Sequence, residues 1–68
     1  MMIAVRINGE ERHLAQSTIL QDYVDTLGVD LDRIAVAHNG VVLRRKVLSS
    51  VTLSEGDQVE IVHAVGGG

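Results

Sequence analysis

The sequence predicts an α+β domain in which one main helix packs on one face of a mixed sheet of four or five strands. Residues near both ends of the chain alternate between apolar and polar side chains with a period of two, which is typical of half-buried strands. Between these segments lies one stripe of apolar residues with helical spacing. A helix with a single apolar face is stable when a sheet covers that face, and this pairing indicates the fold class.

The first two strands form a predicted hairpin. Residues 3–7 alternate isoleucine and valine with alanine and arginine, as expected for a strand with one buried face. Asn8-Gly9 follows, and both residue types tolerate the positive φ angles of a two-residue hairpin turn. We expect the returning strand over residues 11–15, with Leu14 pointing inward.

The helix is predicted over residues 19–27. Its apolar face carries Ile19, Leu20, Tyr23, Val24 and Leu27. Thr18 and Gln21 have the spacing of a capping box, in which each side chain satisfies a free amide at the start of the helix. Gly28 stands where a left-handed C-terminal cap is expected, because glycine adopts positive φ at no steric cost.

A second hairpin is predicted in the middle of the chain. Residues 34–38 form its first strand, Asn39-Gly40 its turn, and residues 41–43 lead away from that turn. The next segment, residues 47–53, fits either a loop with one short turn or an edge strand.

The last strand is predicted over residues 58–65, after a turn cluster at residues 54–57. Because the first and last strands are the most apolar, we expect them to lie side by side and parallel at the centre of the sheet. With the helix in the crossover, this arrangement is a β-grasp, the architecture of ubiquitin. The predicted domain covers residues 1–65, and residues 66–68 form a flexible glycine tail.

The tail is Gly66-Gly67-Gly68, directly after the last strand. Glycine packs nothing and costs backbone entropy when it is ordered, so such a tail adds little to folding. It does allow a narrow cleft to admit the backbone and to reach a free carboxylate. We therefore expect the carboxylate of Gly68 to be the working group; the alternative is an unselected floppy terminus.

Composition argues against several classes of function. A formal net charge of -3 and a single aromatic residue give neither a basic face nor a stacking platform for nucleic acid. There is no cysteine, so the chain supplies no disulfide and no thiolate. The histidines His13, His38 and His63 match no zinc motif, so no metal site is expected. No apolar run is long enough for a membrane span and no signal peptide is evident, so we expect a cytoplasmic protein without a membrane partner.

The sequence resembles the ThiS sulfur carriers of thiamin biosynthesis over nearly its whole length. The motifs that carry the resemblance are Ile7-Asn8-Gly9-Glu10, Thr18-Ile19-Leu20-Gln21, residues 34–40, residues 53–62 and Val65-Gly66-Gly67-Gly68. The chain departs from the family where Leu43 stands near a position that often holds proline, and it has no tryptophan.

The resemblance implies a protein cosubstrate, and not an enzyme. An E1-like adenylyltransferase (ThiF-like) would adenylate Gly68 with ATP and Mg²⁺, so the carrier itself would hold no permanent cofactor. A persulfide from a cysteine desulfurase would then replace AMP, and the resulting thiocarboxylate would supply thiazole synthase (ThiG-like). Gly67 would fit a slot shaped for backbone, and Gly66 would lengthen the arm.

Partner docking is expected on the outward face of the last strand, at Glu60, Val62 and Ala64. The alternative is that Val62 is buried beneath residues 43–53. Arg44-Arg45-Lys46 fits either a solvated loop or a partner contact.

Three other functions share parts of this pattern. The first is sulfur delivery to molybdopterin or another metabolite. The second is a ubiquitin-like modifier that joins lysines through an isopeptide bond. The third is a binding domain whose activity does not depend on the tail.

Overall fold

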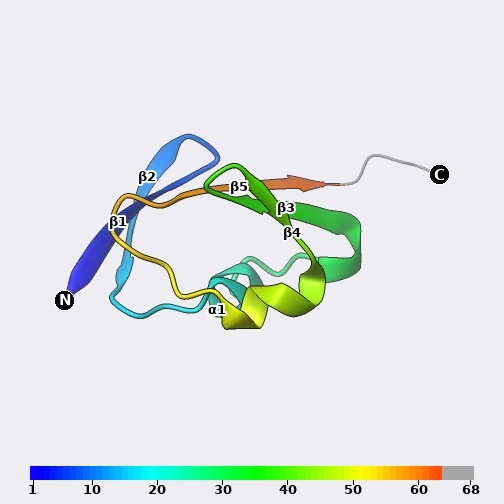
Figure 1. Cartoon of the computed structure of the whole chain (residues 1–68), viewed down its shortest axis with the longest axis horizontal. Helices are drawn as coiled ribbons and strands as arrows, with labels where there is room; N and C mark the ends of the chain where they lie inside the picture. The colour runs from blue at the N-terminus through cyan, green and yellow to red at the C-terminus, as the bar shows by residue number, and fades with distance from the viewer. Residues whose placement is uncertain (64–68) are drawn as a thin grey trace.

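A five-stranded mixed sheet forms one layer of the computed structural model, which describes residues 1–63, and helical segments cover one face of that sheet (Figure 1). The strands are β1 (Met2–Ile7), β2 (Glu10–Ala15), β3 (Ile34–His38), β4 (Val41–Leu43) and β5 (Gln58–His63). The helical segments are α1 (Leu20–Asp25) and two 3-10 helices, η1 (Leu31–Arg33) and η2 (Arg45–Ser50). Residues 64–68 lie outside the described part, so the predicted boundary between domain and tail is not described.

The sheet has the order β2-β1-β5-β3-β4, with β5 in the middle. β5 runs parallel to β1, where Ile7 lies opposite Val59, and antiparallel to β3, where Ile34 lies opposite His63. The first and last strands are therefore parallel neighbours at the centre of the sheet. This topology confirms the predicted β-grasp.

Both predicted hairpin turns are present. Asn8 and Gly9 have φ angles of 53° and 82°, and Asn39 and Gly40 have 51° and 86°. Positive φ at both central residues gives a turn whose twist matches that of the flanking strands. The first hairpin closes between Ile7 and Glu10, so β2 starts one residue earlier than predicted.

The helix is shorter than predicted, and its start differs. Ile19 is the N-cap and forms an isolated β-bridge with Thr52, so α1 begins only at Leu20. The Thr18 hydroxyl donates to the Ala15 carbonyl at 2.6 Å, and no side chain caps the helix. The capping-box prediction is wrong because backbone pairing with the segment after η2 fixes this end of the helix. Gly28 does adopt the predicted left-handed conformation, with φ of 70°.

The segment that the sequence left ambiguous is helical. Residues 45–50 form η2, which contacts α1 and buries Leu48 to 2% exposure. Of the segment's residues, only Thr52 makes a β-bridge, so the edge-strand alternative is wrong. The short helix η1, which the sequence pattern did not indicate, begins where the Asp30 side chain accepts a hydrogen bond from the Asp32 amide at 2.9 Å.

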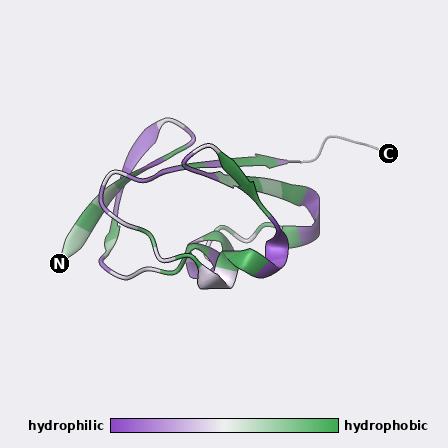
Figure 2. Ribbon diagram, viewed as in Figure 1, coloured by the Kyte–Doolittle hydropathy of each residue, from purple (hydrophilic) through white to green (hydrophobic). Residues whose placement is uncertain are grey.

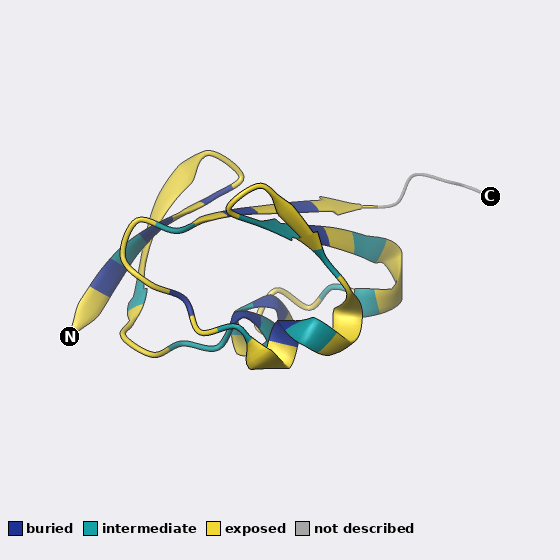
Figure 3. Cartoon of the chain, in the orientation of Figure 1, coloured by how far each residue is buried: buried dark blue, intermediate teal, exposed yellow. Residues whose placement is uncertain are grey.

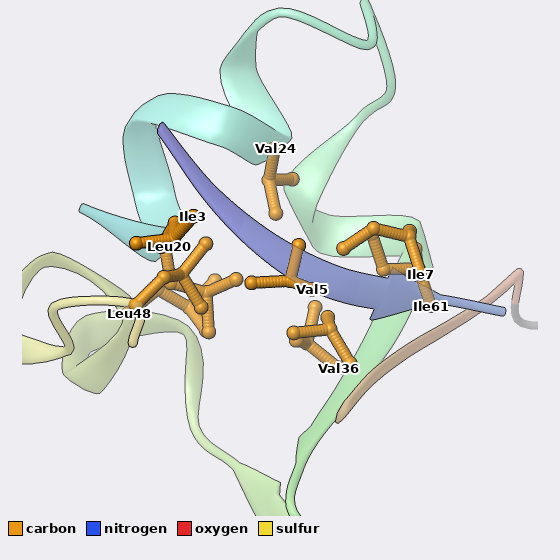
Figure 4. Close-up of a cluster of buried hydrophobic side chains, with 10 residues drawn as sticks. Ile3, Val5, Ile7, Leu20, Val24, Val36, Leu48 and Ile61 are labelled. Carbon is orange, nitrogen blue, oxygen red and sulfur yellow. The ribbon is translucent and has the colours of Figure 1, made fainter. Parts of the chain in front are cut away.

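The core lies between the sheet and the helical layer. Figure 4 shows side chains from β1, β3, β5, α1 and η2 gathered there. The buried residues are Ile3, Val5, Ile7, Leu20, Val24, Val36, Leu48, Leu53, Val59 and Ile61. Leu14 is only half-buried at the edge of this cluster, because β2 is an edge strand.

β5 alternates between the two faces as the sequence predicts. Val59 and Ile61 are buried, whereas Glu60 and Val62 are exposed. Figure 3 shows buried and exposed positions alternating along β5. Among residues 1–63, no helix combines the length and the apolar character that crossing a bilayer requires.

Candidate functional site

The described chain ends at the end of the central strand. His63 is the last residue of β5 and lies opposite Ile34 in β3. Ala64 and the predicted tail residues Gly66, Gly67 and Gly68 follow it and lie outside the described residues. The structure therefore describes the chain up to the strand end that precedes these residues. The docking role of Ala64 and the roles of the three glycines stay predictions.

An apolar patch covers the outer face of the sheet next to this end of β5. It consists of Ala35, Ala37, Val42 and Val62, and we call it the outer patch. Register brings the four together, since Val62 lies opposite Ala35, and Val42 opposite Ala37. Val62 is 57% exposed and Val42 is 73% exposed.

Val62 is exposed, which excludes one of the two predictions made for its side chain. The alternative in which residues 43–53 bury this side chain is wrong, because η2 packs on the opposite face of the sheet (Figure 1). Glu60 is also exposed and lies opposite Ala37, at the border of the outer patch. The strand thus presents a small apolar surface with a charged neighbour, as protein interfaces commonly do.

Two asparagine side chains hold β5 in place. Asn8 Oδ1 accepts a hydrogen bond from the Ile61 amide at 2.7 Å, and Asn8 Nδ2 donates to the Ile61 carbonyl at 3.2 Å. Asn39 Oδ1 accepts from the Gln58 amide at 2.8 Å. Turn formation therefore does not account for the whole role of either Asn-Gly pair. Sequence reasoning missed this second role because both contacts are distant along the chain.

A hydrogen-bonded cluster around Asp57 fixes the start of β5. Asp57 Oδ2 lies 2.9 Å from His38 Nε2 and accepts from the Ser54 amide at 2.9 Å, and Oδ1 accepts from Asn39 Nδ2 at 3.1 Å. Burial raises the pKa of the Asp57 carboxyl, but the hydrogen bonds from His38, Ser54 and Asn39, together with the charge of His38, outweigh it. The net result is an Asp57 pKa below its ordinary value of 3.8.

Asp57→Asn is expected to destabilise the domain at neutral pH and to flatten its acid transition. A lowered folded-state pKa means that the folded protein binds fewer protons than the unfolded chain. The stability that the Asp57 carboxylate contributes to the folded state is therefore fully present above its ordinary pKa of 3.8. It is lost as the pH falls through the lower folded-state pKa. We expect the free energy of unfolding to fall by roughly 1.5–3 kcal/mol at pH 7, which is typical of hydrogen bonds to a charged group. Urea unfolding between pH 2 and pH 7 measures it, and identical pH profiles would contradict the assignment.

The remaining histidines lie at the surface. His13 pairs with Glu11 at 3.3 Å, and His63 is exposed at the end of β5. No three potential metal-ligating side chains cluster within residues 1–63. In the same part of the chain every buried side-chain nitrogen and oxygen has a hydrogen-bond partner. The described cluster at Asp57 is thus a satisfied structural network.

Comparison with protein families gives a match to the ThiS family over residues 5–68. The structure is similar to the crystal structure of the thiamine biosynthesis protein ThiS from Geobacter metallireducens. That similarity has a TM-score of 0.83 with 29% sequence identity, and it covers 97% of this chain and 100% of the other.

Curated relatives fall into two groups of different length. Thiazole synthases of Magnetococcus marinus and Paramagnetospirillum magneticum are 36% and 37% identical over 94% and 91% of this chain. The chain spans only about a fifth of their length, 20% and 19%. The uncharacterized protein ycf40 of Porphyra purpurea is 33% identical over 97% of this chain and 93% of its own length.

Proposed function

The chain belongs to the ThiS family, and from this membership we propose that it carries sulfur for thiamin biosynthesis on the carboxylate of Gly68. The observation that carries the proposal is the family match, which includes the glycine tail. The fold adds support because β5, the central strand, ends at His63, shortly before the glycines in the sequence.

The proposed reaction begins with activation of an unreactive carboxylate. Inside an E1-like adenylyltransferase, an oxygen of Gly68 attacks the α-phosphorus of ATP, and pyrophosphate leaves with Mg²⁺ balancing its charge. A persulfide sulfur supplied by a cysteine desulfurase then attacks the acyl carbon, and AMP leaves. A thiol cleaves the resulting S–S bond and releases the Gly68 thiocarboxylate.

The carrier is a cosubstrate in this scheme. Its proposed contribution is a carboxylate on a narrow arm, because orientation at the α-phosphate supplies much of the rate. A Cβ at Gly67 or Gly68 would widen the arm within a slot shaped for backbone, whereas Gly66 serves as a spacer. The ATP and Mg²⁺ belong to the activating enzyme, and no cofactor stays on the carrier.

Thiazole synthase is the proposed acceptor of the sulfur. In the two longer relatives, a segment similar to this chain makes up about a fifth of a polypeptide named thiazole synthase. Sharing one polypeptide places two partners at a high effective concentration. This occurrence supports delivery of the thiocarboxylate to thiazole synthase by this chain as well.

The outer patch is the proposed docking surface for the activating enzyme, with Glu60 at its border; Ala64, the third residue predicted for this surface, directly follows His63 in the sequence. The outer patch is apolar, exposed and adjacent to the strand end that leads to the tail. Docking there would bring the adenylyltransferase to the base of the arm.

Val62→Asp is expected to weaken binding to the adenylyltransferase about 10–100-fold, because a carboxylate would lose its hydration at the centre of the interface. Val41→Asp is the matched control: Val41 is 60% exposed against 57% for Val62, and it points to the opposite face of the sheet. Titration calorimetry of both variants measures the difference. Equal affinities of the two variants for the adenylyltransferase would show that the outer patch is not part of the interface.

The first test of the proposed function is the intact mass of the protein after incubation with ATP, Mg²⁺, the adenylyltransferase and the desulfurase system. Exchange of one oxygen for sulfur is the expected result, and the chain has no cysteine thiol to complicate it. An unchanged mass with an enzyme set that loads another ThiS protein would contradict the proposal. A ladder of isopeptide conjugates would instead favour a ubiquitin-like modifier.

A further inference from the structure

An open groove of about 580 Å³ lies where α1 meets η2, on the helical side of the molecule. Its lining residues are Gln21, Arg44, Arg45, Lys46 and Ser49, and we call it the basic groove. The three cationic residues are exposed, and they stand at the hydrophilic start of η2 (Figure 2). The outer patch plays no part in this surface, because η2 covers the other face of the sheet.

Charge is distributed unevenly over the chain. The formal net charge is -3, yet the basic groove holds three of the six lysine and arginine residues. Elsewhere Arg12 pairs with Glu10 and Arg33 with Asp30. Within residues 1–63, Arg44 and Lys46 form no ion pair, so the groove has a local excess of positive charge.

The groove is held at the end of the molecule where β5 finishes. Arg45 forms an ion pair with Asp32 in η1. η1 leads directly into β3, whose first residue, Ile34, lies opposite His63 at the end of β5. The start of η2 and the end of β5 therefore lie at the same end of the molecule (Figure 1). An enzyme that receives the tail must approach this end.

We propose that the basic groove docks an acidic surface beside the active-site entrance of thiazole synthase. This inference rests on the proposed function, because it assumes that thiazole synthase receives the tail. The local excess of positive charge in the groove argues for an acidic partner surface. The groove is open and its cations are exposed, which suits steering of a protein surface more than tight capture of a small anion. Steering by exposed charges acts mainly on the association rate and weakens with salt.

The test compares association rate constants of the full chain with thiazole synthase by stopped-flow at low and high ionic strength. Arg44→Gln/Lys46→Gln is expected to slow association ~3–10-fold at ~20 mM salt and less than ~1.5-fold at ~500 mM salt. The control is Arg6→Gln/Arg12→Gln, which makes the same change in net charge on β1 and β2, away from the groove. The control should slow association less than ~1.5-fold at either salt concentration.

Several outcomes would overturn the inference. Equal rate constants for the groove and control variants would show that only net charge matters. Saturable competition by inorganic phosphate at constant ionic strength would identify the groove as a small-anion site. If the wild-type chain neither binds thiazole synthase nor transfers sulfur to it, the proposed acceptor is wrong and this inference falls with it. Thermal unfolding of each variant controls for loss of the fold.

Discussion

Removal of Gly67 and Gly68 is expected to abolish thiocarboxylate formation and to leave the stability of the domain unchanged. The reacting carboxylate would then belong to Gly66, two residues short of the site of adenylation, and misplacement on this scale removes the benefit of positioning. Stability should persist because, within residues 1–63, every buried core residue lies between Ile3 and Ile61. The intact-mass assay measures loading, and thermal unfolding measures stability.

Deletion of Gly66 alone is the matched control for this experiment. It also shortens the arm, but it preserves Gly67-Gly68 next to the terminal carboxylate. We expect this variant to acquire sulfur, with a rate reduced by less than ~10-fold. Loading of the chain that lacks Gly67 and Gly68 would contradict the carboxylate model. Failure of both variants would show that arm length matters as much as the diglycine.

Leu20→Ala is expected to have the largest effect on stability. Leu20 is fully buried, at 0% exposure, where α1 faces the sheet (Figure 4). Loss of its side chain in a packed core costs about 3–5 kcal/mol through lost burial and a residual cavity. A domain of this size has only roughly 3–10 kcal/mol of total stability, so the variant should be close to unfolding at 25 °C.

Leu27→Ala is the control on the same helical stripe. Leu27 is 43% exposed, beyond the end of α1, and its truncation should cost less than about 1 kcal/mol. Urea unfolding at 25 °C separates the two variants. If both variants lost a similar amount of unfolding free energy, the apolar stripe would be buried evenly, contrary to the exposures of these two leucines.

Local signals in the sequence were enough to predict most of the fold. Both Asn-Gly turns and the alternation in β1 and β5 act over a few residues, and each was confirmed. The start of α1 depends instead on pairing between Ile19 and Thr52, which are far apart in sequence. Likewise η2 forms because Leu48 completes the core, a requirement that no local pattern in residues 47–53 reveals.

The candidate site was predictable to a similar extent. Alternation along β5 placed Val62 on the outer face, and its exposure there is confirmed. The hydrogen bonds of Asn8 and Asn39 to β5 arise only when the hairpins pack beside it, so composition gives no sign of them. The basic residues 44–46 were visible in the sequence, but their position at the end of the molecule follows from the Arg45–Asp32 pair.

The place of β5 also constrains how this protein is made. β5 joins the two hairpins, yet among the strands of residues 1–63 it is the last to leave the ribosome. Until then the β1–β2 and β3–β4 hairpins lack their common neighbour, and the core lacks Val59 and Ile61. The complete sheet and core can therefore form only after β5 has been synthesised, and the long sequence separation of the β1–β5 contact slows folding further.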